Sequence, residues 1–300
     1  MIRSFHELLD SVKGRHAKVA AAVAQDAEVL LALDAACRLG IADPILVGET
    51  EEIRSVAAAH GIDISGWELL QESDKAEACR RAVKLVRDGC AQVVMKGIVD
   101  TAVILKAVLD KECGLRDAPV LSHVAIFDVA GFDRLLYITD AAMNIAPDVT
   151  AKAGIIGNAV RVAHALGNEN PIVAALCAVE KVNPKMQATL DAAELVAMNQ
   201  CGEIAGCRVI GPLALDNAIS PEAARHKGIA DPLAGHADIL LVPVIEAGNI
   251  FYKSLTYMAR AKNAGVIVGA KAPVVVTSRA DSEETKLHSI ALAIAMSQGK

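Results

Sequence analysis

Short, continuous aliphatic runs alternate with segments of helical periodicity along most of this chain. Residues 26–39 carry apolar side chains at helical spacing and stop at Gly40, and residues 44–48 then form a short aliphatic run. Glycine is common at the left-handed position after a helix, so this pair predicts a helix followed by a strand. Strands made of unbroken aliphatic runs are typical of a parallel sheet covered on both faces. The pattern predicts an α/β fold with a doubly wound sheet.

The same step from helix to strand recurs further along the chain. Residues 74–88 show helical spacing before Gly89, and residues 91–95 follow as an aliphatic strand. Asp74 and Glu77 stand at the spacing of a capping box at the start of this helix. Further helices are predicted at residues 51–60, 101–109 and 282–296. Further strands are predicted at residues 120–128, 135–138, 172–179, 207–210, 239–242, 266–268 and 274–277.

The domain organisation is predicted from continuity, because no flexible linker, charge block or internal repeat divides the chain. If the final strand and the helix 282–296 return to the N-terminal sheet, the first domain is discontinuous. It then comprises residues 1–130 with 270–300, and residues 131–269 form an inserted second α/β domain. A cleft between the two domains is the expected place for a site.

Composition narrows the class of protein. A net charge of −6 argues against non-specific binding of nucleic acid, which requires a basic face. The chain has no apolar run long enough to span a membrane, and the charges from Arg3 onward leave no signal-peptide core. Its seven cysteines are scattered and odd in number, which suits free thiols in a reducing compartment. We therefore expect a cytoplasmic protein without nucleic-acid or membrane partners.

Residues 277–282, Thr-Ser-Arg-Ala-Asp-Ser, follow an apolar β-branched run and precede a predicted helix. Ser278, Arg279 and Asp281 would supply a hydroxyl donor, a guanidinium fork and a carboxylate at one strand-to-helix junction. This set predicts an anion-handling site. The simpler alternative is a capped helix start, in which Asp281 or Ser282 accepts hydrogen bonds from the first free N–H groups.

Residues 95–101 form a second strand-to-helix turn. Backbone N–H groups at the start of the helix beginning near Thr101 could bind phosphate beside Gly97, with Lys96 as a point charge. The alternative is an ordinary turn carrying a solvated lysine, because short glycine-containing turns recur in every α/β fold.

Several common site motifs are missing from the sequence. Residues 154–157, Gly-Ile-Ile-Gly, lie in a helical pattern without a preceding strand, and no Walker sequence occurs. The eight histidines show no metal-binding spacing, so no metal site is predicted. Without a Gly-x-Ser-x-Gly elbow, a triad hydrolase has no support either.

Over nearly its whole length the chain resembles the phosphate acyltransferases, meaning the phosphate acetyltransferases and phosphate butyryltransferases. The resemblance is carried by residues 26–30, 40–48, 95–101, 246–253 and 277–279. The amino-acid sequence of residues 270–275 and 278–282 is more similar to the phosphate butyryltransferases than to the phosphate acetyltransferases. The resemblance implies reversible transfer of a short acyl group, butyryl favoured over acetyl, between coenzyme A and inorganic phosphate.

The family also implies a two-domain fold similar to the isocitrate and isopropylmalate dehydrogenases. It implies no metal or redox cofactor, because acyl-CoA and phosphate are both substrates, and it implies a homo-oligomer. In related acetyltransferases a serine and arginine at this strand end serve catalysis, and they match Ser278 and Arg279. The catalytic aspartate of those enzymes falls where this chain has Glu284 and Thr285, which leaves Asp281 and Glu284 as candidate bases.

Lesser candidates complete the predicted site. Asn249, Tyr252 and Lys253 are expected at a helix start, where they would contact phosphate or pantetheine; alternatively, Asn249 caps the helix and Tyr252 packs. Lys106 stands near the position of an arginine used by the acetyl enzymes. Ser282 would help to hold phosphate at the start of its helix.

Two other classes of protein stay open at this stage. A dehydrogenase of the isocitrate type would need metal-binding aspartates, for which Asp140 and Asp148 are available without a convincing spacing. A non-catalytic acyl-CoA-binding protein would bind the thioester without phosphate-dependent release of the thiol.

Overall fold

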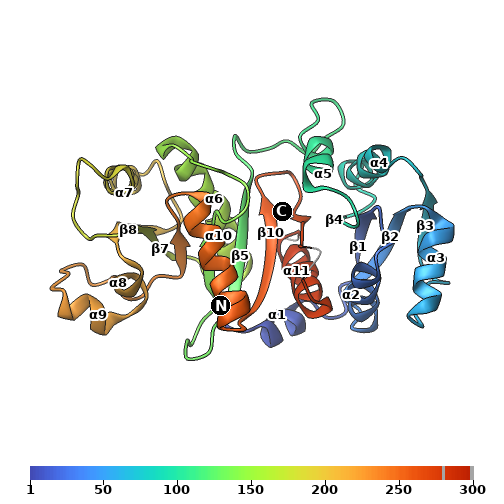
Figure 1. Ribbon diagram of the computed structural model, residues 1–300, viewed down its shortest axis with the longest axis horizontal. Coiled ribbons are helices and arrows are strands. Elements are labelled where there is room, and N and C mark those ends of the chain that lie inside the picture. The colour runs from blue at the N-terminus through green and yellow to red at the C-terminus, as the bar shows by residue number, and fades with distance from the viewer. Residues whose placement is uncertain (279–280, 298–300) are drawn as a thin grey trace. The chain divides into compact units, whose positions relative to one another are not determined.

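The computed structural model describes residues 1–278 and 281–297 (Figure 1). Contacts between Cα atoms divide the chain into two compact units. We call one the terminal unit, formed by Phe5–Ala118 and the described residues from Ala264 onward. The other is the central unit, formed by Met1–Ser4 and Pro119–Asn263. The domain boundaries predicted after residues 130 and 269 stay a prediction.

The terminal unit is built on a largely parallel sheet. Its strands lie in the order β3 (Glu68–Gln71), β2 (Ala42–Gly48), β1 (Ala17–Ala22), β4 (Val93–Lys96), β11 (Val274–Val275) and β10 (Lys262–Val268). The first five run parallel to their neighbours, whereas β10 is antiparallel to β11. The mixed α/β class predicted from the sequence is confirmed, but the sheet also contains an antiparallel pair.

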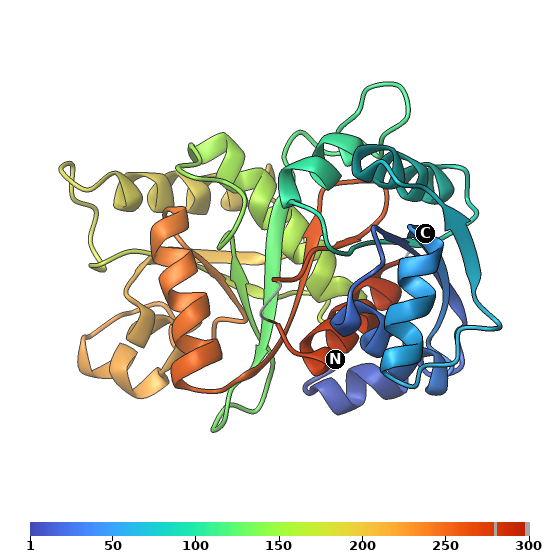
Figure 2. The same ribbon diagram turned by 45° about the vertical axis from the view of Figure 1, so that its right-hand side comes forward.

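Six helices belong to the terminal unit: α1 (Phe5–Val12), α2 (Ala27–Arg38), α3 (Thr50–Ala59), α4 (Lys75–Arg87), α5 (Thr101–Val108) and α11 (Glu283–Met296). The helix α11 packs against both α1 and α2, and α4 packs against α5. Figure 2 shows the red helix α11 beside the dark-blue α1, so the first and last described helices pack together. The aromatic ring of Phe5 stacks on that of His288, with ring centroids 4.1 Å apart.

Capping side chains fix the predicted helix starts. The side chains of Asp26, Asp74 and Ser282 accept hydrogen bonds from the backbone N–H groups three residues later. The helices α2 and α4 each end two residues before a glycine with positive φ, Gly40 and Gly89 respectively, and one C-cap residue stands between. These boundaries confirm the sequence-based prediction because caps are local signals.

Two strands of the terminal unit were not predicted. The central strand β1 has the sequence Ala-Lys-Val-Ala-Ala-Ala, in which Val19 is the one β-branched residue, whereas the predicted strands depended on several. The structure nevertheless buries Val19 and Ala20 completely between β2 and β4. The edge strand β3 is short and only partly buried, so it gave no continuous aliphatic run.

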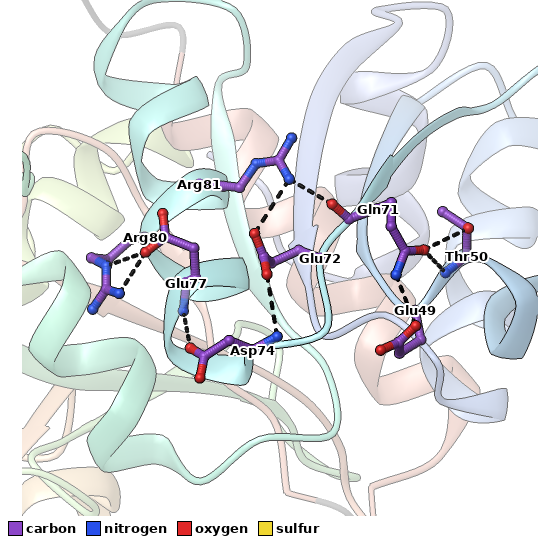
Figure 3. Close-up of polar contacts among 8 residues, drawn as sticks. All are labelled: Glu49, Thr50, Gln71, Glu72, Asp74, Glu77, Arg80 and Arg81. Carbon is purple, nitrogen blue, oxygen red and sulfur yellow. Dashed lines mark hydrogen bonds and ion pairs between the residues drawn. The ribbon is translucent and has the colours of Figure 1, made fainter.

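Polar contacts tie the edge strand β3 to its neighbours (Figure 3). The side chain of Gln71 accepts from the backbone N–H and the hydroxyl of Thr50 and donates to Glu49. Arg81 donates to the backbone carbonyl of Gln71 at 2.6 Å and also faces Glu72. This network therefore joins the end of β3 to the start of α3 and to the middle of α4.

The strands of the central unit lie in the order β5 (Ser122–Asp128), β6 (Leu136–Thr139), β9 (Ile239–Leu241), β7 (Ile172–Leu176) and β8 (Arg208–Leu213). The strands β5 and β6 are antiparallel, and the remaining pairs are parallel. Its helices are α6 (Val149–Ala165), α7 (Gln187–Gln200), α8 (Leu215–Ile219), α9 (Pro221–His226) and α10 (Ile245–Lys253), with the π-helical turn η1 (Ser254–Met258) after α10.

Each of the strands predicted from residue 120 onward is present, although their ends differ. The strand β7 stops at Leu176 rather than at residue 179, and β11 is limited to Val274–Val275. In contrast, β8 and β10 are longer than predicted. Hydrogen-bonding partners in the neighbouring strand determine these ends, and a single sequence does not display them. None of the described helices combines the length and apolar composition that a membrane crossing requires.

We predict that Gly97→Ala destabilises the fold. A Cβ atom at this position would lie 2.1 Å from the backbone oxygen of Val23, and that oxygen accepts from the N–H of Ile98 at 2.9 Å. Relieving this clash requires a backbone shift, which typically costs about 1–3 kcal/mol of unfolding free energy. Urea unfolding measures the loss. Gly66→Ala is the matched control, because its Cβ would meet no heavy atom within 4 Å; equal stability of the two variants would contradict the prediction.

Candidate active site

Two turns of the terminal unit lie at the same edge of its sheet. The strands β4 and β11 are adjacent and parallel, with Val94 opposite Val274 and Met95 opposite Val275. The turns that follow them, residues 96–100 and 276–282, therefore begin side by side at the carboxyl edge, where parallel α/β sheets bind their ligands. The pairing brings together two groups of candidate residues that are some 180 positions apart in the sequence.

The turn after β11 is held by its own carboxylate. The Asp281 side chain accepts from the backbone N–H of Ser278 at 2.7 Å, and the Asp281 N–H donates to the Ser278 carbonyl at 3.1 Å. Ser278 itself is exposed, whereas the preceding Thr277 is buried. Arg279 lies outside the described residues. The capping alternative is confirmed at Ser282, whose hydroxyl accepts from the Thr285 N–H at 3.2 Å.

A buried lysine supports this turn from within α11. Lys286 is only 2% exposed, and its ammonium donates to the carbonyls of Asp281 at 2.5 Å and Ser278 at 3.5 Å. Sequence reasoning missed Lys286, because a lysine inside a helix is usually solvated. The available signal was its place in an otherwise apolar helical face, one turn after the Ser282 cap.

Glu284 lies in the first turn of α11 and is exposed. The two candidate bases differ in their place: Asp281 lies in the turn, where one of its oxygens accepts from the Ser278 N–H, and Glu284 lies on the helix.

The turn after β4 differs from the solvated-lysine alternative drawn from the sequence. Lys96 is 5% exposed, and its ammonium donates to the carbonyls of Gly97 and Val99, each at 3.1 Å. The solvated-lysine alternative is therefore wrong, since the side chain folds back and stabilises its own turn. Its role toward phosphate stays a prediction.

The remaining candidates of the terminal unit lie on α5. Thr101 is the first residue of that helix, and Lys106 lies in its last turn; both are exposed. Five residues of helix separate them by roughly 7–8 Å along the axis. Nothing in this geometry brings Lys106 to the helix start, where the phosphate was predicted.

In the central unit, the helix that carries Asn249, Tyr252 and Lys253 begins earlier than predicted. The helix α10 starts at Ile245 after the N-cap Val244, so Asn249 lies at its middle and Tyr252 and Lys253 at its end, rather than at its start. Asn249 is therefore not the cap; its amide donates to the Ala141 carbonyl at a long 3.4 Å. The start of this helix was misplaced because Val244 makes no side-chain capping bond, so no local signal marks where the helix begins after the strand that ends near Pro243.

Tyr252 packs, as the alternative reading of this residue proposed. Its ring meets Phe127 edge to face at a centroid distance of 5.2 Å, and its hydroxyl donates to the Asn263 side chain at 3.1 Å. Lys253 is exposed, with its ammonium 5.8 Å from the centroid of the Tyr257 ring. These contacts give Tyr252 a structural role that does not depend on a ligand.

The two aspartates that a dehydrogenase would need are engaged in local structure. The buried carboxylate of Asp140 accepts from the N–H groups of Ala142 and Met143, each at 2.9 Å, and from the side chain of Asn144 at 2.6 Å. Asp148 caps α6 through the Ala151 N–H. Over residues 1–278 and 281–297, no group of three or more histidine, cysteine or acidic side chains is arranged to hold a metal ion.

Sequence reasoning also missed an ion pair in the central unit. Lys152 of α6 and Asp191 of α7 are both buried, with the ammonium 2.5 Å from the carboxylate. Both residues lie in apolar helical patterns, which gave no sign that two charges would meet between the helices.

Comparison with known proteins identifies the family. The family described as "Phosphate acetyl/butaryl transferase" matches residues 4–80 and 70–294. The chain is 53% identical to the phosphate butyryltransferase of Clostridium acetobutylicum over the full length of both proteins. It is 45% identical to the phosphate acetyltransferase of Thermotoga maritima, covering 95% of this chain and 97% of that protein.

A solved structure agrees with this assignment. The crystal structure of a branched-chain phosphotransacylase from Enterococcus faecalis V583 has a TM-score of 0.84 and 38% sequence identity, covering 94% of this chain and 99% of that one. The match of sequence and fold extends over both units. The chain therefore belongs to the phosphate acetyl/butyryl transferase family, whose members are acyltransferases.

Proposed function

We propose that this enzyme reversibly transfers a short acyl group, with butyryl favoured, between coenzyme A and inorganic phosphate. The full-length identity of 53% with a phosphate butyryltransferase carries the proposal. Acetyl is the second candidate acyl group, because an acetyltransferase is 45% identical over nearly the whole chain. Acyl-CoA and phosphate are substrates in this scheme, and no cofactor takes part.

The finer fold predictions belong to the same proposal. They comprise the doubly wound arrangement similar to isocitrate and isopropylmalate dehydrogenases, the two domains and the predicted cleft. The division of the chain into two compact units, with the C-terminal segment joining the N-terminal sheet, supports a discontinuous first domain. A homo-oligomeric state and a cytoplasmic location stay predictions.

Ser278 is proposed to stabilise the transition state. Attack of a thiol on an acyl phosphate generates a tetrahedral oxyanion, which needs hydrogen-bond donors. Ser278 is exposed at the carboxyl edge of the sheet, and its turn is fixed from below by Asp281 and Lys286. A hydroxyl on a residue whose backbone is held by these hydrogen bonds is suited to this task, because preorganised donors need little reorganisation during the reaction. Arg279 is proposed to bind phosphate from the same turn.

A carboxylate near this turn is proposed to move the thiol proton. The coenzyme A thiol, with an ordinary pKa of about 8.5, must lose its proton to attack and regain it in the reverse direction. Glu284 is our choice for this base, since it stands near the position of the catalytic aspartate in the related acetyltransferases, while one oxygen of Asp281 accepts from the Ser278 N–H. Asp281 then acts as a positioning residue. Phosphate would sit near the start of α11, whose N–H groups and dipole favour an anion.

The function is tested by release of free coenzyme A from acetyl-, butyryl- and branched acyl-CoAs, followed with a thiol reagent. We expect release only with phosphate present and fastest turnover with butyryl-CoA. Release without phosphate would indicate a thioesterase, and binding without release would indicate an acyl-CoA-binding protein. Either outcome would overturn the proposal.

The protein's own thiols contribute a background signal in that assay. Cys90 and Cys201 are exposed and will react with the reagent. Burial raises the pKa of four other thiols to about 11 or 12, which lowers their thiolate fraction at neutral pH and slows their reaction; they are Cys37, Cys79, Cys177 and Cys207. Enzyme without acyl-CoA supplies the correction.

We predict that Ser278→Ala lowers kcat by about 10²–10³-fold, as removal of one oxyanion donor does in other enzymes. The KM values should change little, because the interaction is made mainly in the transition state. Steady-state kinetics measure both quantities, and thermal unfolding checks that the exposed position tolerates the change. An unchanged kcat would rule out this role.

We predict that Glu284→Gln lowers kcat by about 10²–10⁴-fold and removes the acidic limb of the pH–rate profile. Asp281→Asn should cost less, because the carbonyl oxygen of asparagine can still accept from the Ser278 N–H. Steady-state measurements of kcat against pH for both variants distinguish the two roles. A larger loss in Asp281→Asn would exchange the two assignments, and full activity in both would reject them.

A further inference from the structure

Exposed apolar side chains gather around the helix α10 and the turn η1 of the central unit. Among the described residues nine large apolar side chains are exposed, and five of them lie here, all at least 37% exposed. They are Ile145, Val244, Ile250, Tyr257 and Met258, and we call them the α10 patch. Ile145 adjoins the helix start, because its carbonyl accepts from the Ile245 N–H at 2.9 Å. Clustered apolar side chains mark interaction surfaces, whereas isolated ones need no explanation.

The helix α10 packs on its unit by one side. Of its nine residues, all of them described, only Gly248 is buried, and a Cβ atom there would lie 2.8 Å from the backbone oxygen of Asp140. Phe251 and Tyr252 are partly buried against the hydrophobic core of the central unit. The close approach of the backbone at Gly248 therefore fixes which side of the helix faces inward.

The opposite side of α10 faces solvent. A helix turns by about 100° per residue, so Glu246, Ile250 and Lys253 lie on the side away from Gly248, and all three are exposed. Tyr257 continues this row into η1, because the Lys253 ammonium lies 5.8 Å from the centroid of its ring. Figure 1 and Figure 2 both show the orange helix α10 at the front of the view, with no other ribbon over it. The patch is therefore open to a partner.

The charges on this side are arranged so that they fit a second copy of the same helix. Glu246 lies four residues before Ile250 and Lys253 lies three residues after it, so the two charges flank the isoleucine about 10 Å apart along the helix. If two copies lie antiparallel about a twofold axis near Ile250, each Glu246 faces the Lys253 of the other copy. A parallel pairing would instead place Glu246 against Glu246, and like charges disfavour that arrangement.

The apolar residues of the patch are complementary in the same antiparallel arrangement. Ile145 and Val244 lie at the start of α10, whereas Tyr257 and Met258 lie beyond its end, in η1. An antiparallel pairing brings the start of one helix to the end of the other, so these two apolar groups cover each other and Ile250 meets its own copy at the centre. Tyrosine and methionine are enriched in protein–protein interfaces. Charge and apolar surface thus favour the same partner, a second copy of this chain.

We propose that the α10 patch is a self-association surface, on which α10 and η1 of two copies pack antiparallel about a twofold axis near Ile250. The pair formed by Glu246 of one copy and Lys253 of the other occurs twice, because the axis repeats it, and it sets the orientation of the two helices. The surface lies wholly in the central unit. The proposal goes beyond the acyltransferase function and does not rest on it.

Exchange of the two charges tests this geometry by sedimentation velocity of the full-length protein. The wild type should sediment as a dimer or as a larger assembly built from dimers. Glu246→Lys places lysine against lysine across the interface and Lys253→Glu places glutamate against glutamate, so each single variant should have half the wild-type mass. An equimolar mixture of the two variants should regain the wild-type mass, because both pairs then attract.

Two outcomes would contradict the proposal. A monomeric wild type would mean that the patch serves another kind of partner. Single variants that keep the wild-type mass, or a mixture that stays at half of it, would show that Glu246 and Lys253 do not meet across an interface.

A second variant tests the apolar centre of the patch. Ile250→Asp places two carboxylates at the twofold axis and should also halve the mass. Val182→Asp is the matched control, since Val182 is 51% exposed in the loop between β7 and α7, outside the α10 patch, and this change should leave the mass unaltered. Circular dichroism checks that both variants are folded. Equal masses for the wild type, Ile250→Asp and Val182→Asp proteins would overturn the proposal; if Ile250→Asp does not fold, the charge exchange decides by itself.

Discussion

The pairing of β11 with β4 is the contact on which the candidate site depends. Only two residues, Val274 and Val275, form β11, yet they bring the C-terminal segment back to the sheet that begins at residue 17. Both are completely buried, so the register is fixed by packing as well as by hydrogen bonds. The pairing places the Ser278 turn beside the Lys96 turn and directs α11 onto α1 and α2.

Three buried lysines stabilise turns and helices that follow the strands of the two units. Lys96 and Lys286 donate to backbone carbonyls of their own turns, and Lys152 pairs with Asp191. A buried cation is costly unless it is paired or hydrogen-bonded, and each of these three has oxygen acceptors at 2.5–3.1 Å. Internal cations thus help to hold the turns that follow β4 and β11, and one joins α6 to α7.

Local signals were sufficient for much of the fold. The caps at Asp26, Asp74 and Ser282 and the glycines after α2 and α4 act within a few residues, so their helices were predicted nearly to the residue. The strand β1 was missed because its alanines carry no intrinsic preference for a strand; burial between two neighbours makes it one. For the same reason the start of α10, which has no capping side chain, was misplaced.

The sequence by itself determined the α/β class, the family and the turn that carries Ser278, since these follow from periodicity and from contiguous motifs. Tertiary structure alone decided which turns meet at one edge, that Lys96 and Lys286 face inward, and that Lys152 meets Asp191 across two helices. These features join residues that are distant in sequence, or depend on whether a charged side chain finds acceptors when it is buried. The spacing of residues along the chain shows neither the distant contacts nor the acceptors of buried charges, because packing decides both.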